Sequence, residues 1–133
     1  MAEPNEVIKV VNELINAQAD QLWTISIGLI VAEVFMIAHL VSRRSLTKSH
    51  YIVAFVLGAA VFCHALSLAF GYLSKGALIK AMISRAQGGT WTFPPLAETF
   101  NFYQVTFVSV GLLIFVICFF FYSRELAKAM TAG

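Results

Sequence analysis

The sequence predicts an all-α integral membrane protein with three transmembrane helices, an N-terminal amphipathic helix and a short interfacial helix in the second loop. Composition is the first reason: of 133 residues, 59% are hydrophobic and only 12% are charged, and the mean hydropathy is +0.81. A soluble domain carries about 25% charged residues, and disordered chains are poor in apolar residues. We therefore expect a single membrane domain over residues 1–133 that contacts the lipid bilayer.

The spacing of the charged residues is the second reason. Uncharged stretches of 22, 26 and 25 residues follow Asp20, Lys48 and Glu98, and only Glu33 interrupts them. About 20 apolar residues in a helix cross a hydrocarbon core roughly 30 Å thick. The stretches also lack the alternation of apolar and polar residues that a membrane barrel requires. The predicted spans are residues 22–41, 52–72 and 105–122.

Residues 1–20 are predicted to contain the amphipathic N-terminal helix. Val7, Val11 and Leu14 belong to an apolar stripe with helical spacing. The opposite face is acidic, whereas helices that lie on anionic lipid usually have a basic polar face. The stripe is therefore as well suited to bind a partner helix or a second copy of the chain as to lie on the membrane surface. The simplest alternative is a first helix that packs on its own bundle.

Residues 75–87 are predicted to form the interfacial helix of the second loop. Their apolar residues lie on one face of the helix, and Lys75, Lys80 and Arg85 lie outside that face. An apolar face with a basic polar face suits a helix at the lipid surface. Glycine is the usual residue at a left-handed helix end, so Gly88 is expected to end this helix. Pro95 suits the first turn of the third span.

The flanking charges also predict an orientation in an inner or plasma membrane. The segment before the first span has one Lys and four acidic residues, whereas the loop at residues 42–50 has three Lys or Arg and no acidic residue. Basic loops remain in the cytoplasm. The N-terminus is therefore expected outside, and the C-terminus in the cytoplasm.

Glu33 and His64 are the candidate functional residues. A carboxylate near the middle of a span costs about 2.5–3.5 kcal/mol on insertion scales unless it is neutralised or wetted. Glu33 lies about 16 Å from one face of the membrane and His64 about 18 Å from the other, so antiparallel helices place them at similar depths. Three roles are open: a proton or cation relay, a structural clamp, or a charge that pairs with another subunit.

The second span also carries two rows of small residues that are predicted to pack against other helices. Small side chains let helices approach closely in lipid. The third span contains many phenylalanines and no ionisable residue, so it is expected to face lipid or a partner. The packing residues are Ala60, Ser67 and Gly71 on the face of His64, and Ala54 and Gly58 on the other row.

The sequence contains little that indicates cofactor binding, metal binding, catalysis or nucleic-acid binding. Bis-histidine haem binding needs both ligands at one depth, but His39 lies about 13 Å from His64 along the membrane normal. Cys63 and Cys118 lie in predicted spans without a metal-binding spacing. No catalytic motif appears, and basic residues are too few for nucleic-acid binding. We expect no cofactor, no metal, no nucleic acid and no enzymatic activity.

The sequence therefore predicts a small polytopic membrane subunit that assembles with itself as a homo-oligomer or with other membrane subunits. In this interpretation Glu33 and His64 form an intramembrane polar element for proton or cation passage. One alternative is a self-assembling pore former, either a holin-like protein or a toxic effector, although the strongly basic tail of three-span holins is missing. Another is a non-conducting scaffold that anchors a partner.

Overall fold

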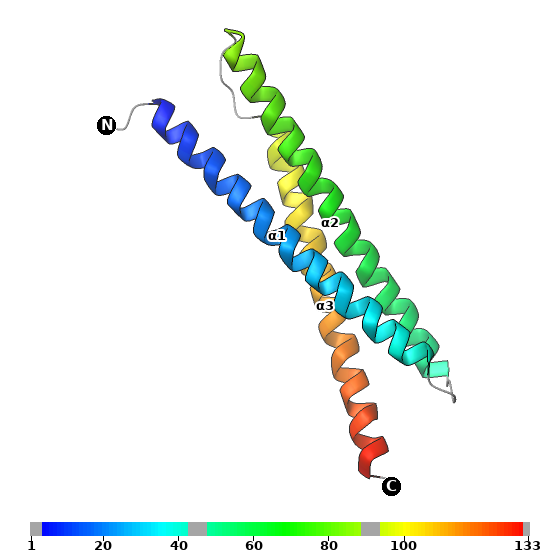
Figure 1. The fold of residues 1–133 in the computed structure, drawn as a ribbon. Helices are drawn as coiled ribbons and strands as arrows, with labels where there is room; N and C mark the ends of the chain where they lie inside the picture. The colour runs from blue at the N-terminus through cyan, green and yellow to red at the C-terminus, as the bar shows by residue number, and fades with distance from the viewer. Residues whose placement is uncertain (1–3, 43–47, 89–93, 132–133) are drawn as a thin grey trace.

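The computed structural model describes residues 4–42, 48–88 and 94–131, which form three long α-helices (Figure 1). The helices are α1 (Pro4–Val41), α2 (Lys48–Ala86) and α3 (Pro95–Thr131), with 38, 39 and 37 residues. At 1.5 Å per residue each is roughly 56–58 Å long. The end of the bundle where α1 and α3 begin and α2 ends is called the N-terminal end here, and the opposite end is called the C-terminal end.

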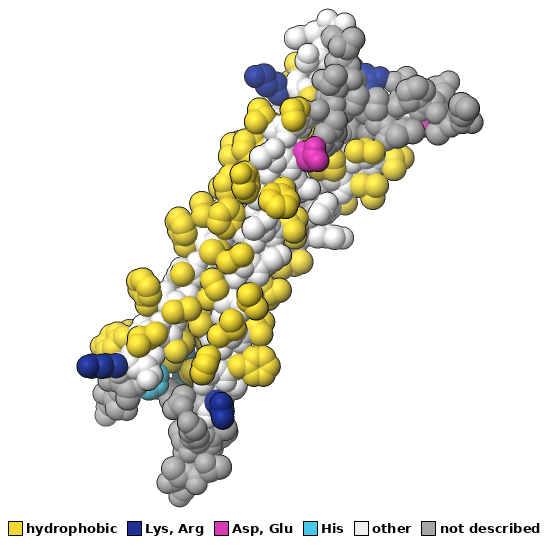
Figure 2. All heavy atoms as spheres, turned by 180° about the vertical axis from the view of Figure 1, so that it is seen from behind, with side chains coloured by type: hydrophobic (Ala, Val, Ile, Leu, Met, Phe, Trp, Pro, Cys, Tyr) yellow, Lys and Arg dark blue, Asp and Glu magenta, His cyan; other side chains and the backbone are white. Residues whose placement is uncertain are grey.

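All three helices are long and apolar enough to cross a membrane. Figure 2 shows hydrophobic side chains over the length of the bundle, while the charged side chains in view lie towards its two ends. Phe35 and Phe55 are 75% and 81% exposed. Glu33, by contrast, is fully buried. This apolar exterior with polar groups inside indicates a membrane protein.

The helices are more continuous than the sequence predicts. The N-terminal segment and the first span form one helix, and residues 75–86 extend the second span without a break. Neither junction contains a proline, and a single glycine such as Gly76 costs a helix only about 1 kcal/mol. The chain turns instead at Gly88, whose φ of 90° is the left-handed conformation expected there.

Buried residues recur at intervals of seven in α1 and α3. Such spacing is typical of helices that pack side by side with a left-handed twist. In α2 the intervals between buried residues alternate between three and four, because this helix packs against both α1 and α3. The helices α1 and α3 make few contacts with each other. The buried series are Ala19, Ser26, Glu33 and Leu40 in α1; Leu57, Ala60, His64, Ser67, Gly71, Ser74 and Leu78 in α2; and Ala97, Gln104, Gly111 and Cys118 in α3. Met36 in α1 and Val108 in α3 are buried as well, between members of these series.

The interior of the bundle changes character along its length. Towards the C-terminal end, Met36, Leu40, Leu57 and Cys118 form an apolar cluster. From the pair of Glu33 and His64 towards the N-terminal end, most of the buried side chains are polar or small. The candidate site lies where these two halves meet.

Candidate functional site: a buried glutamate–histidine pair

Glu33 of α1 and His64 of α2 are in contact inside the bundle. Nδ1 of His64 lies 3.1 Å from Oε2 of Glu33 in hydrogen-bond geometry. It lies 3.1 Å from Oε1 as well, and both side chains are fully buried. The contact can form because α1 and α2 are antiparallel neighbours and each residue belongs to the buried series of its helix. An ionised Glu33 with a neutral His64 carries one negative charge. One additional proton, on the carboxyl group or on the imidazole, brings the net charge of the pair to zero.

Gly111 of α3 makes room for the imidazole. A Cβ atom at position 111 would lie 2.6 Å from Nε2 and 2.7 Å from Cε1 of His64, well inside van der Waals contact. The Nε2 edge of the ring therefore faces the backbone of α3. Although α3 contributes no ionisable side chain here, the ring is held between two helices by a glycine that sequence reasoning missed.

Gln104 of α3 lies on the N-terminal side of the pair and contacts α1. Its Nε2 donates a long hydrogen bond of 3.5 Å to the carbonyl oxygen of Ala19. A Cβ atom at Gly71 of α2 would lie 2.6 Å from both Gln104 Nε2 and Trp23 Nε1. The absence of a side chain at position 71 therefore lets an amide from α3 and an indole from α1 meet at the centre of the bundle.

Two serines of α2 fix the register of α3. The hydroxyl of Ser67 donates to the carbonyl oxygen of Gln104 at 3.1 Å, and the hydroxyl of Ser74 donates to that of Ala97 at 3.0 Å. The two bonds are seven residues apart on both helices. Because the backbone carbonyls are already bonded within α3, each serine adds a second bond to its acceptor, which fixes Gln104 beside α2 on the N-terminal side of the pair.

An ion pair lies at the outer edge of this polar part of the interior, towards the N-terminal end of the bundle. Nζ of Lys75 bonds Oδ1 of Asp20 and lies 5.5 Å from the centroid of the Trp23 ring. Both charged side chains are partly exposed. Between this ion pair and Glu33–His64 lies a polar column, defined here as Trp23, Ser26, Ser67 and Gln104, with one or more members on each helix.

Several buried polar atoms of this region have no hydrogen-bond partner among the described residues. Oε1 of Glu33 and Nε2 of His64 are the second polar atoms of the pair. The column adds Nε1 of Trp23, Oγ of Ser26 and Oε1 of Gln104. Buried polar atoms are normally paired. Their number makes this half of the interior the part of the bundle with unbonded buried polar groups.

The opposite side of the pair offers no such groups in the part of the chain that the structure describes. The apolar cluster of Met36, Leu40, Leu57 and Cys118 fills the interior there, with Val53, Ile114 and Phe115 among the side chains packed against it. Among the described residues, buried polar atoms without a hydrogen-bond partner therefore lie on one side of the pair only, while Tyr122 is the polar side chain packed against the apolar cluster on the other.

The other predicted site residues take different positions. Ala60, Ser67 and Gly71 are buried, and Ala54 is half-buried. Gly58 is exposed, and a Cβ atom added to it would have no other atom within 4 Å. Leu14 is 64% exposed and Val11 is 38% exposed. The side chain of Val7 lies outside the described residues.

Cys63 is half-buried and Cys118 is buried, and both are free thiols. Within the described ranges, no group of three His, Cys, Asp or Glu side chains could hold a metal ion. One sequence signal could have identified Gln104 and Gly111: they continue a seven-residue spacing that begins at Ala97 and ends at Cys118.

Comparison with known proteins finds no match: no protein-family model, no curated protein and no solved structure is similar to this chain. The functional interpretation of this chain therefore depends on the geometry of its own residues.

Proposed function

We propose that this chain is a small membrane subunit that assembles with itself or with other membrane proteins and that Glu33 and His64 serve the passage of protons. One observation carries the proposal: the pair is fully buried, and yet Nε2 of His64 has no hydrogen-bond partner in the described part of the chain, and Oε1 of Glu33 has only the 3.1 Å contact with Nδ1. A purely structural clamp gains most when every buried polar atom is bonded. A buried ring nitrogen without a hydrogen-bond partner suits a group that takes up and releases protons.

A proton fits this site better than a metal cation. Imidazole can accept a proton on one ring nitrogen and release it from the other, and Nδ1 of His64 already contacts the carboxylate. A cation such as calcium needs six to eight oxygen ligands. The described site offers one carboxylate, and Gly111 packs closely against the ring.

The apolar cluster supports a role as a subunit rather than as a complete transporter. The cluster of Met36, Leu40, Leu57 and Cys118 closes the bundle beyond the pair. Passage across the membrane then requires a second chain or a rearranged α1. The same cluster favours a non-conducting scaffold as the second candidate, in which the pair only locks α1 to α2.

The orientation is part of the proposal. The flanking charges favour a cytoplasmic C-terminal end in an inner or plasma membrane, because the loop at residues 42–50 is basic and the segment before the first span is acidic. The polar column then lies on the outer side of the pair, and the apolar cluster lies on the cytoplasmic side.

Flux through purified proteoliposomes tests the proposal. Glu33→Gln keeps the shape and a hydrogen-bonding group but removes the titratable carboxyl. We expect it to reduce proton flux at least tenfold while the oligomer size in detergent stays unchanged. Glu13→Gln, at an exposed carboxylate of the same helix, is the matched control and should keep wild-type flux.

The double variant Glu33→Gln/His64→Gln separates a working pair from two independent residues. If the two act as a unit, the double variant loses no more flux than either single variant, because non-additive effects identify residues that act together. Wild-type protein without flux in any assembled state would contradict the proposal and favour the scaffold. Dissociation of the oligomer by Glu33→Gln would instead identify Glu33 as a charge between subunits.

A further inference from the structure

The helices continue beyond the membrane at the N-terminal end of the bundle. Asp20 and Lys75 form an exposed ion pair, and such charges avoid the hydrocarbon core. From this pair α2 runs on to Ala86 for about 16 Å, and α1 reaches back to Pro4 for about 24 Å. The headgroup layer is only about 5–8 Å thick on each side. Both helix ends therefore project into water.

Apolar side chains on the projecting end of α2 are exposed. Ile79, Met82 and Ile83 are 56%, 50% and 53% exposed, and Lys80 lies among them in the sequence. We call these four residues the basic end of α2. Ile79 lies at the level of the lipid headgroups and Met82 and Ile83 lie beyond it. Contiguous exposed apolar surface outside the hydrocarbon core marks a protein-binding site.

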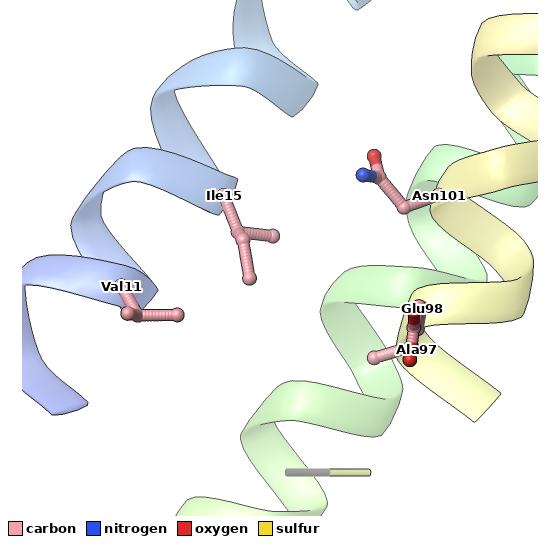
Figure 3. A pocket seen from close by; sticks show the side chains of 5 residues that line it. All are labelled: Val11, Ile15, Ala97, Glu98 and Asn101. Atoms are coloured by element: carbon pink, nitrogen blue, oxygen red, sulfur yellow. The ribbon is translucent and has the colours of Figure 1, made fainter. Parts of the chain in front are cut away.

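A groove opens at the same end between α1 and α3 (Figure 3). Towards its N-terminus α1 diverges from the other two helices (Figure 1), and the space holds about 360 Å³. The lining combines apolar side chains with a carboxylate and with the Oδ1 atom of Asn101, which is buried and has no partner within the described ranges. We call it the acidic groove: Val11, Ile15, Ala97, Glu98 and Asn101.

We infer that the acidic groove binds the basic end of α2 from a second copy of this chain and that the two copies do so reciprocally. The chemistry is complementary, because an apolar groove with Glu98 at its wall suits an apolar helix that carries Lys80. The inference rests on the self-assembly in the proposed function and names its interface.

The positions along the membrane normal support the pairing. Counted from Asp20 and Lys75, Ile79–Ile83 lies about 6–12 Å further out and Val11–Ile15 about 8–14 Å further out. Both surfaces therefore lie at one level in copies inserted in the same orientation. A two-fold axis along the membrane normal brings each basic end to the other copy's groove, which closes the assembly as a dimer.

Charge reversal in two separate copies tests the interface. In Lys80→Glu and in Glu98→Lys, each homodimer would bring two like-charged pairs together, so we expect its dissociation constant to rise about tenfold. In a 1:1 mixture of the two variants, both contacts of the mixed dimer regain opposite charges. The mixture should return to within about threefold of the wild type. The measurement is energy transfer between copies labelled at the C-terminus, in vesicles of neutral lipid.

Lys9→Glu is the matched control, because it makes the same charge change at an exposed site on the same end of the molecule. It should leave the dissociation constant unchanged. Rescue in the mixture also shows that both variants are folded. A monomeric wild type, a mixture no better than its components, or an equal loss in Lys9→Glu would overturn the inference. Because association is measured without flux, a dimer that carries no protons would leave the interface standing and remove only the proposed function.

Discussion

The two halves of the bundle interior are held together in different ways. On the N-terminal side, three helices meet through side chain–backbone bonds, an amide and the Glu33–His64 contact. On the C-terminal side, Met36, Leu40, Leu57 and Cys118 pack without polar contacts between them. Lipid tails are as apolar as leucine, so moving apolar side chains from lipid into the bundle interior contributes little free energy in either half. The apolar half depends on close packing, and the polar half depends on bonds that lipid cannot replace.

Truncation in the apolar half should have the largest effect on stability. Leu57 is fully buried, so Leu57→Ala should lower the free energy of unfolding by about 2–4 kcal/mol through the cavity it leaves. Titration with sodium dodecyl sulfate, followed by tryptophan fluorescence, measures the change. Leu113→Ala is the control, because this leucine is 61% exposed on α3 and its loss should change stability little. Equal losses at the two positions would show that the interior is not specifically packed.

A methyl group at the junction of the halves should have the next largest effect. Gly111→Ala places a Cβ 2.6 Å from His64 Nε2, and overpacking of this kind costs about 1–3 kcal/mol. The same displacement should reduce proton flux, because it moves the imidazole. Gly58→Ala meets no atom within 4 Å and should be neutral or stabilise α2 by up to about 1 kcal/mol. A harmless Gly111→Ala would mean that the ring does not lie against α3.

Loss of a single bond in the polar half should have the smallest effect. Ser67→Ala removes the hydroxyl that donates to the Gln104 carbonyl, and interhelical hydrogen bonds in membranes average about 0.6 kcal/mol. Ser109→Ala, on the exposed face of α3, serves as the comparison in the same titration. A loss above about 2 kcal/mol at Ser67 would indicate that the polar column acts as one cooperative network.

The three membrane-spanning helices can be predicted because charge is almost absent from long stretches of the sequence. The continuity of the helices is harder to predict, because composition separates the amphipathic segments from the spans. Composition reports the environment of a segment, whereas continuity depends on the absence of a breaker between Ala19 and Leu22 and on a lone Gly76. The apolar and basic faces of residues 75–87 predict a separate helix along the membrane surface, but α2 continues straight through residues 75–86.

For the site, depth along each helix suggests that Glu33 and His64 lie close together. Depth alone cannot reveal the contribution of α3, because glycine carries no signal of charge and Gln104 lies just outside the predicted span at residues 105–122. Gln104 and Gly111 become visible only through the seven-residue spacing of their helix, which the many phenylalanines on the outer face of α3 obscure.

The fit of His64 against Gly111 also restricts the order in which this chain can change during evolution. The imidazole already occupies the volume that any side chain at position 111 would need. Replacement of the glycine while the ring is present costs about 1–3 kcal/mol, whereas after loss of the ring it meets no such cost. Once a larger residue is established at position 111, the return of histidine at position 64 carries the same cost until glycine returns. Descendants that lose the pair in this order would be committed to a different interior.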